Sequence, residues 1–162
     1  MTDACGATNF GDLPCDGRQS IAALAIARGT SRCLLAHGFA RIPELTLANG
    51  RRADLIAINE KGAIWIVEIK SSLADFRADQ KWTDYRDYCD RFFFAVAPEF
   101  PRDVLPVDAG LIVADGYGGE IVRPATDATL AGARRKEITQ RFARVAALRL
   151  HALADPELKL EL

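Results

Sequence analysis

Two charged residues close an apolar segment of the sequence. The run Ala63-Ile64-Trp65-Ile66-Val67 leads directly into Glu68-Ile69-Lys70. Because side chains alternate along a strand, Glu68 and Lys70 lie on the same face. An acid and a base at the end of a buried strand either form a structural ion pair or bind a metal ion and activate water.

A short hairpin gives Glu68 a partner. Residues 60–62 (Glu-Lys-Gly) match a three-residue loop, a type I turn followed by a left-handed glycine. Counting outward from this loop places Asp54 opposite Glu68, with their Cβ atoms roughly 5 Å apart. The same face is apolar near the loop, where it carries Ile56, Ile58, Ile64 and Ile66. It therefore turns from apolar to ionic at its far end.

The acid pair predicts a metal site. Two carboxylates at this separation repel each other unless a positive charge lies between them. Mg²⁺ prefers oxygen ligands and usually takes one or two protein carboxylates together with water and phosphate oxygens. Asp54 and Glu68 meet that need for Mg²⁺ or Mn²⁺, and the Ile69 carbonyl adds a third oxygen. Lys70 would orient or deprotonate a metal-bound water, or stabilise charge on a phosphate. The alternative is that Lys70 bridges the two acids in a structural triad.

Composition and length exclude several classes of protein. The chain has 162 residues, of which 49% are hydrophobic and 27% charged, as is typical of one globular domain. Since no apolar stretch approaches the roughly 20 residues that span a bilayer, we expect no membrane partner. Residues 1–16 lack a secretory pattern, so we expect a cytoplasmic protein with a flexible tail over 1–16 and one domain over 17–162. The four cysteines and two histidines match no zinc-site spacing. With a net charge of −1, any affinity for nucleic acid must come from local patches.

Helices and strands are expected in an order that suits a mixed α/β layer. The patterns predict helices over 17–38, 75–89 and 127–153, with a weak point in the first helix at residues 29–31. They predict strands over 42–48, 52–59, 63–70, 91–97, 111–114 and 120–123. The order is a helix, a three-strand meander, a helix, a strand, then further strands and a long final helix. This is not a repeating βαβ chain.

This arrangement resembles the PD-(D/E)XK nuclease superfamily, whose restriction-endonuclease-like core is an αβββαβ unit with a mixed central sheet flanked by helices. More narrowly, the segments RADLIAIN (52–59), IVEIKSS (66–72) and DQKWTDY with YCDRFFFAV (79–96) resemble the MmcB family of bacterial DNA repair proteins. The resemblance covers roughly residues 18–150. It implies a metal-dependent nuclease that hydrolyses phosphodiester bonds in DNA repair. Asp54 and Glu68 would be metal ligands and Lys70 the catalytic lysine.

Three positions depart from the superfamily pattern or extend it. Ala53 stands where the superfamily has a proline before the first acid. Gln80 is carried over as a catalytic residue, although Tyr85 stands one residue too far along for the Gln-x-x-x-Tyr motif of some relatives. Glu44 matches an upstream glutamate that several members place at the metal site. It serves equally well as an exposed strand residue.

Candidate DNA-binding residues flank the acid pair, each with a structural alternative. They are Arg51, Arg52, Ser71, Lys81, Trp82, Arg134 and Arg135. The first two would hold a phosphate or flank a turn, and Ser71 would bind phosphate or cap a helix. Trp82 would stack on a base, but core packing is the favoured interpretation. The basic residues of the final helix, from Arg134 to Arg149 and including Arg141 and Arg144, would supply salt-sensitive DNA affinity or form a solvated face.

Two other functions fit the same residues. The first is a catalytically silent module of this fold that binds a DNA structure or recruits another DNA repair protein. The second is a small structural α/β protein in which Asp54, Glu68 and Lys70 form only an ion-pair network. Binding of a divalent metal and cleavage of DNA separate the nuclease from both.

Overall fold

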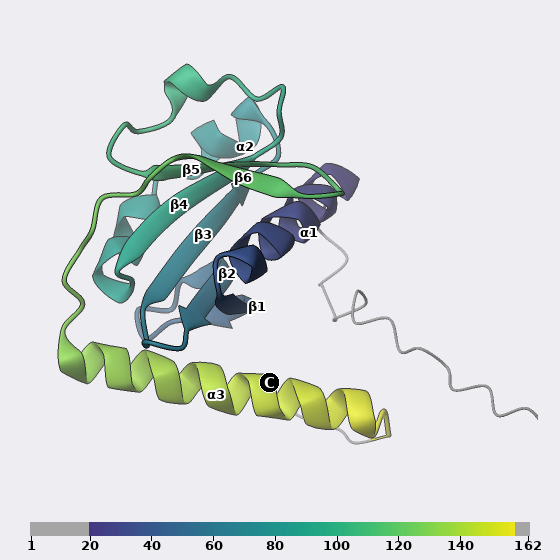
Figure 1. The fold of residues 1–162 in the computed structure, drawn as a ribbon, viewed down its shortest axis with the longest axis vertical. Coiled ribbons are helices and arrows are strands. Elements are labelled where there is room, and N and C mark those ends of the chain that lie inside the picture. Colours follow the sequence, from purple (N-terminus) through teal and green to yellow (C-terminus); the bar gives the residue numbers. More distant parts are fainter. Residues whose placement is uncertain (1–19, 158–162) are drawn as a thin grey trace, which may run out of the picture.

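A six-stranded mixed sheet forms the centre of the molecule (Figure 1). The computed structural model describes residues 20–157. Its strands, which lie side by side in chain order, are β1 (Phe39–Thr46), β2 (Arg52–Asn59), β3 (Ile64–Lys70), β4 (Arg91–Val96), β5 (Gly110–Ala114) and β6 (Gly119–Arg123). The β3–β4 and β4–β5 pairs are parallel, and the other pairs are antiparallel. The expected mixed α/β fold is confirmed.

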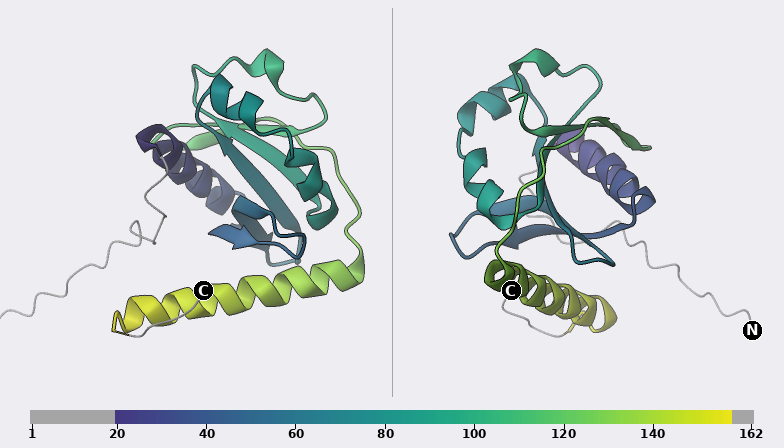
Figure 2. Two further views of the ribbon diagram at one scale, coloured as in Figure 1. Left: turned by 180° about the vertical axis from the view of Figure 1, so that it is seen from behind. Right: turned by 60° about the vertical axis from the view of Figure 1, so that its left-hand side comes forward.

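Helices cover both faces of this sheet. They are α1 (Ile21–Ala36), α2 (Leu73–Ala78), α3 (Gly132–Ala154) and the short 3₁₀ helices η1 (Trp82–Tyr88) and η2 (Arg102–Val104). Figure 2 shows α1 on one face, with α2 and η1 on the other. The long helix α3 lies beside the β1–β2 end of the sheet (Figure 1). No helix within residues 20–157 is long and apolar enough to cross a membrane.

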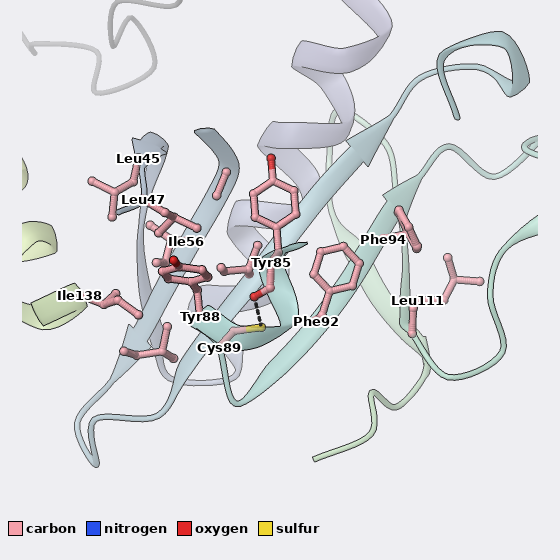
Figure 3. Close-up of a cluster of buried hydrophobic side chains, with 14 of the residues drawn as sticks. Leu45, Leu47, Ile56, Tyr85, Tyr88, Cys89, Phe92, Phe94, Leu111 and Ile138 are labelled. Atoms are coloured by element: carbon pink, nitrogen blue, oxygen red, sulfur yellow. Dashed lines mark hydrogen bonds between the residues drawn. The ribbon is translucent and has the colours of Figure 1, made fainter. Parts of the chain in front are cut away.

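The two faces of the sheet build separate apolar cores. Leu55, Trp65 and Val67 pack toward α1, whereas Ile56 and Ile66 point to the opposite core. Figure 3 shows part of that opposite core, where η1 supplies Tyr85 and Tyr88, the residue after it is Cys89, and α3 supplies Ile138. All seven residues of β3 are buried. The polar end of β3 is therefore set in a fully packed strand, which holds its backbone rigidly.

The single helix expected over 75–89 is wrong. The helix α2 ends at Ala78, Asp79 has an extended backbone (φ −115°, ψ 98°), and η1 begins at Trp82. The Asp79 carboxylate accepts hydrogen bonds from the Lys81 N–H at 3.1 Å and from Lys70 Nζ at 2.9 Å. These local bonds compete with continuation of the helix, which is a known effect of aspartate.

The first helix is unbroken at its expected weak point. The helix α1 passes so close to the β5–β6 turn that a Cβ atom on Gly29 would lie 2.0 Å from the Asp115 carbonyl oxygen and 2.3 Å from that of Gly118. The glycine is there to let two backbones approach, and it does not interrupt the helix. The other predicted element boundaries differ from the observed ones by at most five residues, and both ends of β2 are as predicted. The tail expected over residues 1–16 lies outside the described residues.

Candidate functional site

The hairpin between β2 and β3 has the predicted loop. Gly62 has a left-handed backbone (φ 77°), and its N–H donates to the Asn59 carbonyl at 3.0 Å. The strands pair from Ile58–Ile64 to Leu55–Val67. One step beyond this ladder stand Asp54 and Glu68, where counting from the loop placed them.

Where the backbone pairing between β2 and β3 ends, hydrogen bonds to the side chains of Asp54 and Glu68 take its place. The Asp54 N–H donates to Glu68 Oε1 at 3.2 Å, and the Ile69 N–H donates to Asp54 Oδ2 at 2.8 Å. Each carboxylate thus satisfies a backbone donor of the opposite strand. The exchange fixes both side chains in orientation, which a metal site requires of its ligands.

Burial sets the protonation of this pair. Desolvation raises the pKa of Asp54 to about 6, even though the Ile69 N–H and Lys70 favour its charged form. Desolvation, and then repulsion by Asp54, raise the pKa of Glu68 to about 8. Glu68 therefore holds a proton at neutral pH unless a cation compensates its charge.

Lys70 is the buried cation of the site. Its side chain is only 4% exposed, and its Nζ lies 2.9 Å from Asp79 Oδ2 and 3.9 Å from Glu68 Oε2. Burial alone lowers the pKa of Lys70, but the hydrogen bond to Asp79 and the charge of Glu68 together raise it above its usual value. Lys70 is thus held as an ammonium ion. The sequence alone assigned Asp79 no role at the site, because its contact with Lys70 depends on the break after α2.

A cavity of about 400 Å³ opens over these residues. It is lined by Ser20, Ala23, Arg52, Asp54, Glu68, Ile69, Lys70, Ser71, Asp75, Asp79 and Tyr85. Four of these residues are acids and two are bases, so the cavity is acidic. The Tyr85 hydroxyl, at the wall of this cavity, donates to the Arg52 carbonyl at 2.9 Å. Burial, followed by the charges of Glu68 and Asp54, raises the pKa of this hydroxyl.

The donor set fits a small divalent ion. Asp54, Glu68 and the Ile69 carbonyl supply few protein oxygens, which matches the preference of Mg²⁺ for sites completed by water and phosphate. Within residues 20–157, no group of three or more His, Cys, Asp or Glu side chains is placed to hold a metal ion. Water or substrate oxygens must therefore complete the coordination of any ion held here.

Glu44 lies on the other side of Asp54 from Glu68. It falls between the β1–β2 pairs Pro43–Leu55 and Leu45–Ala53, and its left-handed backbone (φ 50°) interrupts that ladder. The Glu44 charge helps to raise the pKa of Asp54, yet the side chain lines a neighbouring groove and not the acidic cavity. The structure thus brings Glu44 close to the pair without making it part of the cavity wall.

Of the candidates around α2 and η1, only Ser71 lines the acidic cavity. Ser71 lines the cavity, and its N–H and Oγ both donate to Asp75 Oδ2, at 3.1 and 3.4 Å. Gln80 is exposed at the end of α2 and lies outside the cavity lining, as does the exposed Lys81. Trp82 packs on the rings of Phe92 and Phe94, each at a centroid distance of 5.5 Å. That is the packing interpretation favoured from the sequence.

The arginine candidates also differ in whether they line the acidic cavity. Arg51 pairs with Asp84 at 2.9 Å, and Arg52 lines the acidic cavity. Arg135 forms a bidentate pair with Asp90, both contacts being 2.7 Å, and donates to the Gly62 carbonyl at 2.8 Å.

Arg134 donates to the Asp87 carbonyl at 3.1 Å and lies 4.6 Å above the Tyr88 ring. Gly62 is in the loop at the opposite end of β3 from Lys70. This strand has seven residues, and at about 3.3 Å per residue its ends are roughly 20 Å apart. Arg134 and Arg135 thus anchor α3, and the Arg135 contact lies at the far end of the sheet from the acidic cavity.

Comparison with known proteins identifies the family of this chain. A family model described as DNA repair protein MmcB-like matches residues 12–157. The chain belongs to the MmcB-like DNA repair protein family. The resemblance read from residues 52–96 is thereby confirmed, and membership of the MmcB-like family implies a role in DNA repair.

The fold of this MmcB-like chain is shared by a solved structure. A protein of unknown function from Silicibacter pomeroyi is 48% identical and superposes with a TM-score of 0.84. The match covers 88% of this chain and 97% of that protein. No curated protein matches the chain.

Proposed function

We propose that this protein is a metal-dependent deoxyribonuclease that hydrolyses phosphodiester bonds during DNA repair. The observation that carries the proposal is the pair of half-buried Asp54 and buried Glu68, which faces an open acidic cavity with Lys70 at its wall. Two neighbouring acids whose pKa values are raised by desolvation need a cation to be charged together. Membership in a DNA repair family supports DNA as the source of the phosphodiester.

Asp54, Glu68 and the Ile69 carbonyl would hold Mg²⁺ or Mn²⁺. When bound, such an ion polarises a phosphoryl oxygen and makes a coordinated water more acidic. The protein's own contribution is geometric, because the reciprocal hydrogen bonds between β2 and β3 fix both carboxylates before any ion arrives.

Lys70 would stabilise negative charge on the phosphate. Its ammonium is kept protonated by Asp79, so it is a poor base for removing a proton from water. A fixed cation beside the metal site is worth most where charge develops in a water-poor cavity. Of the two roles considered from the sequence, charge stabilisation is the one that the Asp79 contact favours.

Metal binding is the first test. Isothermal titration of Mn²⁺ into wild type and Asp54→Asn should show one ion bound by the wild type and at least roughly tenfold weaker binding by the variant, because one of two charged ligands is lost. Asp103→Asn, which removes an exposed acid on the β4–β5 loop, is the matched control and should bind as the wild type does. Equal Mn²⁺ binding by wild type and Asp54→Asn would contradict the proposed metal site.

Cleavage is the second test. Plasmid, single-stranded and flapped DNA are incubated with Mg²⁺ or Mn²⁺ and with wild type, Lys70→Met or Lys81→Met. We expect cleavage by the wild type and by Lys81→Met, whose lysine is exposed outside the cavity. Loss of the Lys70 charge should lower the rate by at least about 10²-fold. Cleavage that survives in a Glu68→Gln/Lys70→Met double variant must come from a contaminant or another site.

A catalytically silent DNA-binding module is the second candidate. It is favoured by the internal satisfaction of the site, since the two acids bond to opposite strands and Lys70 bonds to Asp79. In that case DNA is bound with a steep salt dependence, and no substrate is cut with any divalent metal. The same module would serve to recruit another DNA repair protein.

A further inference from the structure

A second and larger hollow lies next to the acidic cavity. It is a groove of about 630 Å³ between β1 and the middle of α3. Its lining residues are Glu44, Leu45, Thr46, Arg52, Glu137, Gln140, Arg141, Arg144, Val145 and Arg149. Four arginines face two glutamates, so the groove is basic in a chain whose net charge is −1.

Two of these arginines fasten α3 to β1. Arg141 pairs with Glu137 at 2.7 Å and donates to the Thr46 carbonyl at 3.3 Å. Arg149 donates to the carbonyls of Pro43 and Glu44. Backbone carbonyls are neutral partners, so the positive charge of Arg149 still contributes to the potential of the groove.

Arg144 differs from Arg141 and Arg149. It is exposed, it lines the groove, and within residues 20–157 no side chain or carbonyl is hydrogen-bonded or ion-paired to it. A guanidinium has five N–H donors and binds phosphate oxygens in pairs. Arg144 can therefore take up a phosphate without giving up a contact inside the protein.

The groove and the acidic cavity share Arg52. This residue opens β2, two positions before Asp54, and it lines both hollows. A polymeric ligand that lies in the groove therefore passes Arg52 before it reaches the Asp54–Glu68 pair. The acidic cavity itself repels phosphates, so the affinity for a polyanion has to come from outside it.

We propose that the groove between β1 and α3 binds the phosphodiester backbone of one DNA strand, with Arg144 as a principal phosphate contact, and directs that strand past Arg52 toward the acid pair. The direction rests on the proposed nuclease function, whereas binding in the groove does not. Of the basic residues that the sequence analysis considered on the final helix, Arg134 and Arg135 anchor α3, and Arg144, farther along the same helix, is the one that this proposal assigns to the DNA backbone.

The test measures binding apart from cleavage. Fluorescence anisotropy of a labelled oligonucleotide is recorded in EDTA over a series of salt concentrations, for wild type, Arg144→Gln and Lys136→Gln. Lys136 is the matched control, because it is exposed on the same helix and lies outside the groove. Single-stranded and duplex oligonucleotides are both used, since either presents one strand's backbone.

Arg144→Gln should weaken binding about fivefold for single strands and about eightfold for duplex at 0.1 M salt. The slope of log affinity against log salt should become shallower by about 0.7 for single strands or about 0.9 for duplex. Lys136→Gln should leave affinity and slope unchanged. Unchanged binding by Arg144→Gln, or an equal loss in the two variants, overturns the proposal.

Failure of this proposal is distinguishable from failure of the proposed function. If DNA binds through Arg144 but is never cut with Mg²⁺ or Mn²⁺, the groove stands and the nuclease fails. If the wild type cuts DNA and Arg144→Gln has unchanged affinity and KM, the groove proposal fails alone. Asp54→Asn should bind DNA in EDTA at least as well as the wild type, because it removes a negative charge beside Arg52.

Discussion

Replacing Glu68 by glutamine should stabilise the metal-free protein at alkaline pH. The folded-state pKa of Glu68 is raised from an ordinary value of 4.5 to about 8, first by desolvation and then by Asp54. Between these two values the folded chain binds a proton that the unfolded chain has released. Stability is therefore full below the unfolded pKa and is lost as pH rises through the folded one.

The size of the effect follows from that shift. One pKa unit corresponds to about 1.4 kcal/mol, and integrating the titration between pH 6 and pH 9 attributes a loss of about 3 kcal/mol to Glu68 alone. Glutamine carries no titrating proton, so the Glu68→Gln variant should lack this loss. Its amide oxygen still accepts the Asp54 N–H, which keeps the β2–β3 junction intact.

Urea unfolding followed by tryptophan fluorescence, in EDTA at pH 6 and pH 9, measures this difference. Glu60→Gln, at an exposed loop position on the same hairpin, is the control and should follow the wild type. Saturating Mg²⁺ at pH 9 should restore the wild type and have little effect on Glu68→Gln. If Glu68→Gln loses as much free energy of unfolding between the two pH values as the wild type does, the burial argument is wrong.

Three further predictions concern the metal and the packing. Mn²⁺ binding at pH 7 should release about one proton, mainly from Glu68, and only about 0.1 proton at pH 9. Titration calorimetry in buffers of different ionisation enthalpy counts the released protons. An equal count at both pH values contradicts the assignment. Gly29→Ala should destabilise the fold by about 2–4 kcal/mol in thermal melts, because its Cβ collides with two backbone carbonyls, whereas Gly132→Ala, with nothing within 4 Å, should stay near the wild type. Arg135→Met should lower the free energy of unfolding by about 2–3 kcal/mol, because Asp90 loses its bidentate partner, and should speed hydrogen exchange in α3. The Mn²⁺ affinity should stay unchanged. A loss of Mn²⁺ affinity would contradict the separation between Arg135 and the acidic cavity.

The amino-acid sequence by itself determined the acid pair. A three-residue loop with a left-handed Gly62 leaves one register for the two strands, and strict alternation then brings Asp54 and Glu68 together on one face. The element order was also readable from the sequence, because apolar periodicity and turn residues are local signals. The family resemblance followed from segments on these same elements, and the family model confirmed it.

Only the tertiary structure decided which charges meet. The contact of Lys70 with Asp79 depends on the break after α2, and the pairing of Arg135 with Asp90 joins residues 45 positions apart. The groove beside Arg144 exists because α3 lies against β1, an arrangement that the amphipathic pattern of α3 leaves open. Hairpin register is local and follows from chain geometry, whereas the partners of long charged side chains are selected by packing between distant elements.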